Sequence, residues 1–231
     1  YIYLMAAPDW KNADFGQPVE KIRQQLVSSH QYIEDKNTPV VPYLIHEAHK
    51  YGTKVLLSFA GEGFREKVEN PETRHKFIRF ISAFIKKYDY DGIEIDWESD
   101  LSLPLHADFI KELRIALHAL EKETKKKLYL TTALHSWQKY SRPLADRLSS
   151  SVDWLNIMTY DMGGGIWGNV AGHNTPLDQI EREMKNWDVF DRNRLCIGLA
   201  NYGFIYHNIA PGQKVEGKLN RYGSYISYNK M

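Results

Sequence analysis

The chain has 231 residues, of which 30 are basic and 29 acidic, so its formal net charge is +1. This balance predicts no nucleic acid or other polyanion as a partner. No run approaches the roughly 20 apolar residues of a membrane-spanning helix, so we expect no membrane association. The single cysteine excludes an internal disulfide framework and a cysteine-rich zinc site.

Short apolar runs alternate with helical patterns along the chain, which is typical of β/α units built around a parallel sheet. We expect strands at residues 1–7, 54–58, 92–97, 127–133, 152–159 and 195–200, and a last aromatic strand at 224–228. Helices are predicted at residues 40–51, from Pro71 onward, at 105–122, at 143–148 and from Pro176 onward.

Six strands of this kind fit a doubly wound sheet as well as a (β/α)8 barrel. Polar residues follow the carboxyl ends of five of the strands, at Ser58, Glu98, His135, Tyr160 and Asn201. In a barrel these ends converge on one mouth, which is where barrel active sites lie. The convergence favours the barrel, although the strand count is two short.

The most informative stretch is Tyr90–Glu98, in which Glu94, Asp96 and Glu98 alternate with large apolar residues. In an extended strand this alternation places the three carboxylates on one face. Acids crowded on one face repel one another, which raises the pKa of at least one of them. A carboxylic acid that stays protonated beside an ionised neighbour is what general acid catalysis at a glycosidic oxygen requires.

Other interpretations of the same residues stay open. Alternating acids also describe a half-exposed antiparallel strand with a solvated face. A divalent metal site is disfavoured because all three acids come from one strand, and we expect neither a metal nor a cofactor. Residues 163–168 match a glycine-rich nucleotide-binding pattern, but no helix opens there, which argues against that function. Cys196 lies in an apolar run and is expected to be buried.

Residues 91–98, Asp-Gly-Ile-Glu-Ile-Asp-Trp-Glu, resemble the strand-four signature of glycoside hydrolase family 18, the chitinase family. Residues 54–61, 156–161 and 197–203 are similar to its strand-three, strand-six and strand-seven motifs. The four motifs occur in the family's order over most of the chain. The resemblance implies an α/β fold, a (β/α)8 TIM barrel of which strands two to seven are present and the first and eighth are not found.

The resemblance also implies roles for individual residues in a retaining, substrate-assisted hydrolysis. Glu98 would protonate the leaving glycosidic oxygen and later activate water. Asp96 would orient the substrate's 2-acetamido group, Glu94 would exchange hydrogen bonds with Asp96, and Tyr160 would hydrogen-bond the acetamide. The remaining candidate substrate-binding residues are Asp161, Met158, Ser58, Tyr202 and Trp137. Trp10, Trp137, Trp167 and Tyr202 are candidate sugar-stacking platforms.

Three features depart from the family pattern. Glu94 occupies a position that is usually Asp, Ala60 replaces a glycine, and the terminal strands are not found. We therefore expect residues 1–231 to be one barrel domain within a longer chain. The expected function is hydrolysis of β-1,4-linked N-acetylglucosamine glycans by a secreted or extracellular monomer. The alternatives are an inactive chitinase-like carbohydrate-binding protein and an interaction domain that keeps only the fold.

Overall fold

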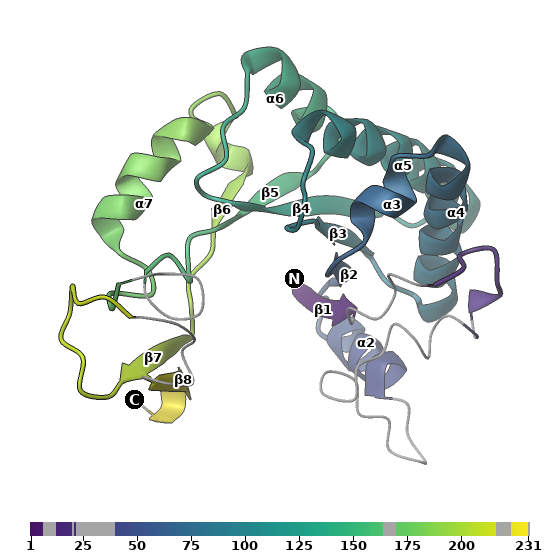
Figure 1. Ribbon diagram of the computed structural model, residues 1–231. Helices are drawn as coiled ribbons and strands as arrows, with labels where there is room; N and C mark the ends of the chain where they lie inside the picture. The colour runs from purple at the N-terminus through teal and green to yellow at the C-terminus, as the bar shows by residue number, and fades with distance from the viewer. Residues whose placement is uncertain (7–12, 20, 22–39, 164–169, 216–222, 231) are drawn as a thin grey trace. The chain divides into compact units, whose positions relative to one another are not determined.

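The computed structural model describes residues 1–6, 13–19, 21, 40–163, 170–215 and 223–230 (Figure 1). Its strands are β1 (Ile2–Ala6), β2 (Val55–Ala60), β3 (Gly92–Asp96), β4 (Tyr129–His135), β5 (Trp154–Met158), β6 (Leu195–Ile197), β7 (Tyr202–Tyr206) and β8 (Gly223–Ser227). Its α-helices are α2 (Val40–Lys50), α3 (Phe64–Val68), α4 (Pro71–Tyr88), α5 (Leu103–Thr124), α6 (Arg142–Ser149) and α7 (Leu177–Met184). Three single-turn 3₁₀ helices are η2 (Lys185–Trp187), η3 (Arg192–Arg194) and η4 (Tyr228–Lys230).

The described strands form two sheets. The larger has six strands in the order β1-β2-β3-β4-β5-β6, so neighbours in the sequence are also neighbours in the sheet. The pairs β1–β2, β2–β3 and β3–β4 are parallel, and α2, α3 with α4, and α5 supply the crossovers between them. β7 and β8 form a separate antiparallel pair. The α/β class and the six barrel-type strands predicted from the sequence are confirmed.

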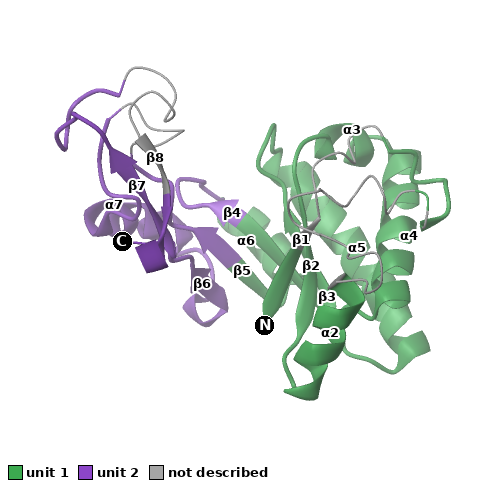
Figure 2. Ribbon diagram, turned by 90° about the horizontal axis from the view of Figure 1, so that it is seen from below, with its two compact units in different colours: residues 1–133, 141–155 green, residues 134–140, 156–231 purple. Residues whose placement is uncertain are grey.

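The chain divides into two compact units (Figure 2). Unit 1 comprises residues 1–133 and 141–155, and unit 2 comprises residues 134–140 and 156–231. The division therefore falls within β4 and within β5. In unit 1, α3, α4, α5 and α6 form a row in which each helix packs against the next.

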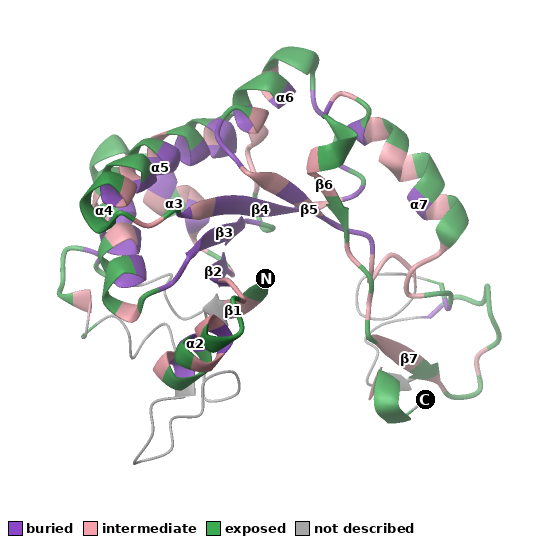
Figure 3. Cartoon of the chain, turned by 180° about the vertical axis from the view of Figure 1, so that it is seen from behind, coloured by how far each residue is buried: buried purple, intermediate pink, exposed green. Residues whose placement is uncertain are grey.

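The core of unit 1 lies between these helices and the sheet. The apolar residues of α4 at the spacing of one helix face are all buried, at Phe77, Phe80, Ile81, Phe84 and Ile85, and Figure 3 shows buried positions gathered along one side of α4 and α5. Pro71 occupies the first turn of α4, and the Asn70 side chain accepts hydrogen bonds from two backbone amides there. An N-cap of this kind satisfies donors that the helix leaves unpaired.

Close contact between β3 and β4 depends on a glycine at the start of β3. A Cβ added to Gly92 would lie 2.1 Å from the carbonyl oxygen of Tyr129, its register partner on β4. That distance is far below van der Waals contact with backbone, so a side chain there would push the two strands apart. The glycine after Asp91 thus keeps the acid-bearing strand against its neighbour.

In unit 2, a buried aromatic cluster of Tyr140, Trp187 and Phe190 anchors the segment that follows α7. Trp187 donates its indole N–H to the carbonyl oxygen of Ser136 at 2.8 Å. Among the described residues, no helix is both long enough and apolar enough to cross a membrane.

Candidate active site

Glu94, the first carboxylate of β3, belongs to a layer of polar side chains that crosses three strands of unit 1. Ser58 on β2, Glu94 on β3 and Thr131 on β4 are register partners. The Ser58 hydroxyl donates to Glu94 Oε2 at 2.9 Å, and the Thr131 hydroxyl donates to Glu94 Oε1 at 3.5 Å. All three side chains are buried, so Glu94 is a carboxylate whose orientation its neighbours hold.

Asp96 lies two residues further along β3 and on the same face as Glu94. It is 7% exposed, and its Oδ1 atom has no hydrogen-bond partner in the described structure. Burial, followed by the charges of Glu98 and then Glu94, raises the pKa of Asp96 to about 8. The sequence prediction that crowding would perturb one of these acids is consistent with this pKa, although burial is the larger cause.

Glu98 lies outside the strand. We expected a strand over residues 92–97 with Glu98 directly after it and all three acids on one face, but β3 ends one residue earlier, at Asp96. Trp97 is buried, whereas Glu98 is exposed directly before the turn at Ser99 and Asp100. The carboxylate assigned to proton transfer is therefore accessible from outside, two residues after a buried acid whose pKa is raised.

Asp91, the first acid of the signature, has a different environment. It is fully buried at the amino end of β3, where it accepts from the Val55 amide at 2.8 Å and contacts His49 Nε2 at 2.7 Å. Lys126 Nζ lies 3.1 Å from its other oxygen. Burial opposes ionisation of Asp91, but these hydrogen bonds outweigh it and lower its pKa. Asp91, directly before β3, therefore links this strand to β2 through Val55 and to α2 through His49, which is a structural role.

The predicted substrate-binding residues of unit 2 form a second group. The Tyr202 hydroxyl donates to Asp161 Oδ1 at 2.8 Å. Burial and this bond raise the pKa of Tyr202. Asn174 was not predicted: its side chain accepts from the Asp161 amide at 2.5 Å and donates to the Tyr202 carbonyl at 3.1 Å. Asn174 therefore sets the geometry of both predicted residues, and no local sequence pattern signals it.

Tyr160 approaches the backbone of the next strand segment closely. A Cβ added to Gly198 would lie 2.6 Å from Cε1 of the Tyr160 ring, so this glycine makes room for the ring. Thr159 donates its hydroxyl to the Gly198 carbonyl at 2.6 Å, which fixes the same contact. Met158, at the end of β5, is 9% exposed and packs in the interior.

Trp137 follows the carboxyl end of β4 and is 60% exposed. Its ring stacks on that of His135, with centroids 5.3 Å apart and planes 14° apart. Such a pair presents a flat aromatic face to solvent, which suits stacking on a sugar ring. The other two tryptophans predicted as platforms, Trp10 and Trp167, lie outside the described residues.

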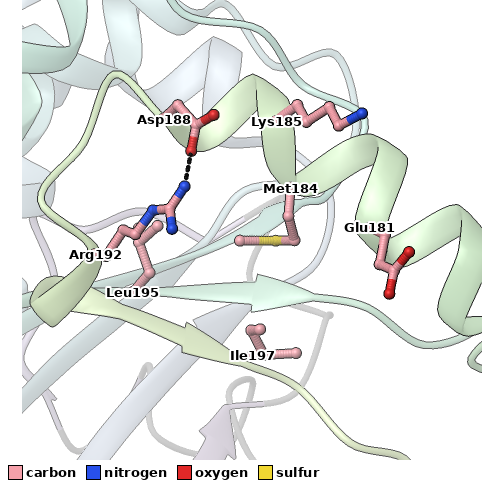
Figure 4. A pocket seen from close by; sticks show the side chains of 7 residues that line it. All are labelled: Glu181, Met184, Lys185, Asp188, Arg192, Leu195 and Ile197. Atoms are coloured by element: carbon pink, nitrogen blue, oxygen red, sulfur yellow. Dashed lines mark hydrogen bonds and ion pairs between the residues drawn. The ribbon is translucent and has the colours of Figure 1, made fainter.

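A pocket of about 480 Å³ in unit 2 contains none of the predicted site residues (Figure 4). Met184, Leu195 and Ile197 form its apolar part.

Cys196 is exposed on β6, so the prediction that its thiol would be buried is wrong. The reason is that β6 is the last strand of the six-stranded sheet in the described chain. Within the residues that the structure describes, no three His, Cys, Asp or Glu side chains are grouped to hold a metal ion.

The sequence matches the family model for glycosyl hydrolases family 18 over residues 21–230. This chain belongs to that family. Chitinase A1 of Niallia circulans is 30% identical over an alignment of 143 residues, and the match covers 54% of this chain and 20% of the relative. The class V chitinase of Arabidopsis thaliana is 28% identical over 172 residues, and chitinase-3-like protein 2 of Homo sapiens is 28% identical over 184. This chain spans 45% of the length of each of the last two.

Solved structures of family 18 chitinases share the fold. The Cycas revoluta enzyme in complex with allosamidin superposes with a TM-score of 0.74 at 18% identity, covering 100% of this chain and 71% of that one. The complex of a mutant of a Cycas revoluta class V chitinase with (GlcNAc)3 gives a TM-score of 0.70 at 20% identity, covering 82% of this chain and 63% of that one. The resemblance to a (β/α)8 barrel with strands missing is confirmed.

Proposed function

We propose that this family 18 chain carries the catalytic machinery of a hydrolase of β-1,4-linked N-acetylglucosamine glycans. The observation that carries the proposal is the pairing of two unlike acids: Asp96 is buried with its pKa raised to about 8, and Glu98 beside it is exposed. One carboxyl group is thereby kept protonated at neutral pH while its neighbour stays accessible to a substrate.

In the proposed reaction, the proton that Asp96 holds at neutral pH is transferred to Glu98, and Glu98 donates it to the glycosidic oxygen as that bond breaks. The carbonyl oxygen of the substrate's own 2-acetamido group attacks the anomeric carbon and forms an oxazolinium ion. Water then attacks the same carbon, Glu98 accepts a proton from it, and the configuration is retained. Asp96, ionised by that transfer, orients the acetamide and stabilises its developing positive charge, and Glu94, held by Ser58 and Thr131, lies on the same face two residues before it.

The unit 2 residues supply the substrate contacts in this proposal. Tyr160 donates a hydrogen bond to the acetamide, and Asp161 contacts the sugar at the cleavage point. Tyr202 fixes Asp161 through its 2.8 Å hydrogen bond. The exposed ring of Trp137, stacked on His135, supports a further part of the proposal, a platform for a neighbouring sugar ring. A secreted, monomeric state of the full protein remains a prediction.

The test is release of a fluorogenic leaving group from N-acetylglucosamine oligomers by the natural full-length protein. Glu98→Gln removes the acid at nearly constant size and is expected to lower kcat about 10²- to 10⁴-fold. Glu123→Gln, an exposed carboxylate that pairs with Lys86 at the surface, is the matched control and should retain wild-type turnover.

Each result separates two functions. Turnover that falls in Glu98→Gln and not in Glu123→Gln supports the hydrolase. Absence of turnover in the wild type, with oligomer binding retained in calorimetry, contradicts the hydrolase and establishes the carbohydrate-binding alternative. Turnover that survives in Glu98→Gln would reject the assignment of the general acid.

A further inference from the structure

Glu98 is exposed, but the short helix α3 contacts residues on both sides of it in the sequence. α3 follows β2 after Gly61 and Gly63, both of which have positive φ, 111° and 96°. A glycine adopts such angles without strain, so this turn brings α3 back against the end of β3. The first two residues of the helix, Phe64 and Arg65, contact the two flanks of Glu98.

The amino-terminal flank is held through Trp97. Phe64 is 1% exposed and stacks on the Trp97 ring, with centroids 5.5 Å apart and planes 16° apart. His106 of α5 packs edge-on against the same indole at 6.2 Å. The indole N–H donates to the carbonyl oxygen of Ser99 at 2.8 Å, so one hydrogen bond spans Glu98 from the residue before it to the residue after it.

The carboxyl-terminal flank is held by Arg65. Its Nη2 donates to the carbonyl oxygen of Asp100 at 2.9 Å, and its Nε lies 2.5 Å from the Asp100 carboxylate. Asp100 has a φ of 56°, a conformation that an aspartate adopts at some cost and that needs external support. The guanidinium supplies this support through a hydrogen bond to the backbone carbonyl of Asp100 and an ion pair with its carboxylate.

We propose that Phe64 and Arg65 of α3, acting through Trp97 and Asp100, form a bracket that positions the Glu98 carboxylate for proton transfer. The inference rests on the proposed hydrolase function and adds positioning residues that do not touch the substrate. An exposed glutamate has many accessible rotamers and a mobile backbone unless its flanks are fixed. Fixing the backbone on both sides reduces that freedom while the carboxylate stays open to substrate.

The experiment compares two bracket variants in the natural full-length protein. Arg65→Gln removes the grip on Asp100 at a half-exposed position, and Trp97→Phe keeps an aromatic ring against Phe64 but removes the N–H donor. Both are expected to lower kcat about 10- to 100-fold, because a displacement of about 1 Å can cost this much, while KM changes little. Arg65→Lys retains a donor for the Asp100 carbonyl and should restore part of the loss.

The matched control is Arg147→Gln, which breaks a surface ion pair with Asp108 on the same unit. It should leave kcat and KM unchanged. A purely structural role for Arg65 would lower thermal stability without the separation of kcat from KM and without rescue by Arg65→Lys. Wild-type kcat in both bracket variants, with active wild-type protein, overturns the bracket and leaves the hydrolase proposal standing.

If the wild type shows no turnover, the hydrolase proposal is contradicted. A second measurement then tests whether Phe64 and Arg65 fix the backbone around Glu98. Backbone amide exchange at Glu98, Ser99 and Asp100 should accelerate in Arg65→Gln and Trp97→Phe relative to Arg147→Gln. Equal exchange in all three variants would overturn the bracket by itself.

Discussion

Ser58 and Glu94 are register partners on adjacent parallel strands, and a 2.9 Å hydrogen bond joins the hydroxyl of one to the carboxylate of the other. The serine belongs to the strand-three motif and the glutamate to the strand-four motif. Two separate sequence signatures of the family are thus parts of one buried polar layer. Glu94 stands where the family pattern has Asp, and its side chain bonds Ser58 and Thr131 in that position.

Ser58→Ala should destabilise the protein more than Thr131→Val. Both substitutions remove a buried hydroxyl that donates to Glu94, but the Ser58 bond is 2.9 Å long and the Thr131 bond is 3.5 Å. A buried hydrogen bond to a charged group contributes about 1.5–3 kcal/mol, and a long one contributes less. Urea unfolding of both variants measures the difference. An equal or larger cost for Thr131→Val would contradict the distances.

The raised pKa of Asp96 should respond unequally to its two acidic neighbours. After burial, Glu98 is the larger cause of the shift and Glu94 the smaller. Glu98→Gln should therefore lower the pKa of Asp96 more than Glu94→Gln does, and both variants should leave it above its ordinary value of 3.8 because Asp96 stays buried. Carboxyl ¹³C NMR titration reports this directly. The reverse order, or a normal pKa in either variant, would show that charge and burial contribute differently.

Asp96 also makes stability depend on pH, with a sign that follows from its raised pKa. Between pH 3.8 and about 8 the folded state holds a proton on Asp96 that the unfolded state has lost. The contribution of Asp96 is therefore fully present below pH 3.8 and is lost as pH rises through 8. The free energy of unfolding of the wild type relative to Asp96→Asn should fall by roughly 2–5 kcal/mol across that interval.

Denaturant unfolding of both proteins at pH 4, 6 and 8 measures this difference. The comparison with Asp96→Asn cancels other titrating groups, including His106, whose full burial lowers its pKa to about 3. A difference that stays constant with pH, or rises, would mean that Asp96 is ionised in the folded protein at neutral pH.

Periodic side chains made the larger elements predictable. The buried stripe of α4 and the alternation in β3 each repeat over enough residues to identify the element. The predicted strand 92–97 differs from β3 by one residue at its carboxyl end, and the predicted strand 224–228 differs from β8 by one residue at each end. The predicted strand was too long because the alternation of acids and apolar residues continues past Asp96, the last residue of β3 that pairs with a neighbouring strand. Glu98 therefore lies one residue further from the strand end than predicted.

Features that depend on distant partners were not predictable in this way. α3 has five residues, too few to show a period, and its contacts with Trp97 and Asp100 come from a separate part of the sequence. Asn174 acts on Asp161 and Tyr202 through a loop with no motif. Cys196 was misjudged because an apolar run predicts burial only where another element covers the strand.

The ion pair between Arg114 and Asp153 should be the most costly one to break from one side. Arg114 is 8% exposed, donates to the carbonyls of Ser151 and Leu128 at 2.7 and 3.1 Å, and contacts Asp153. Arg114→Met leaves these groups without their donor and should cost about 3–5 kcal/mol. Asp153→Asn should cost less, because an amide oxygen can still accept from the Leu130 amide.

The double variant Arg114→Met/Asp153→Asn should cost less than the sum of the two single variants, since the second substitution removes a charge that the first had left with only the half-exposed Lys127, 3.3 Å away, as its ion-pair partner. Arg182→Met, which breaks the exposed Arg182–Asp178 pair, is the control and should change stability by no more than about 0.5 kcal/mol. Urea unfolding of the four variants gives the coupling energy. Strict additivity would mean that Arg114 acts through the two backbone carbonyls alone and that the ion pair contributes nothing to holding α5 against the segment before β5.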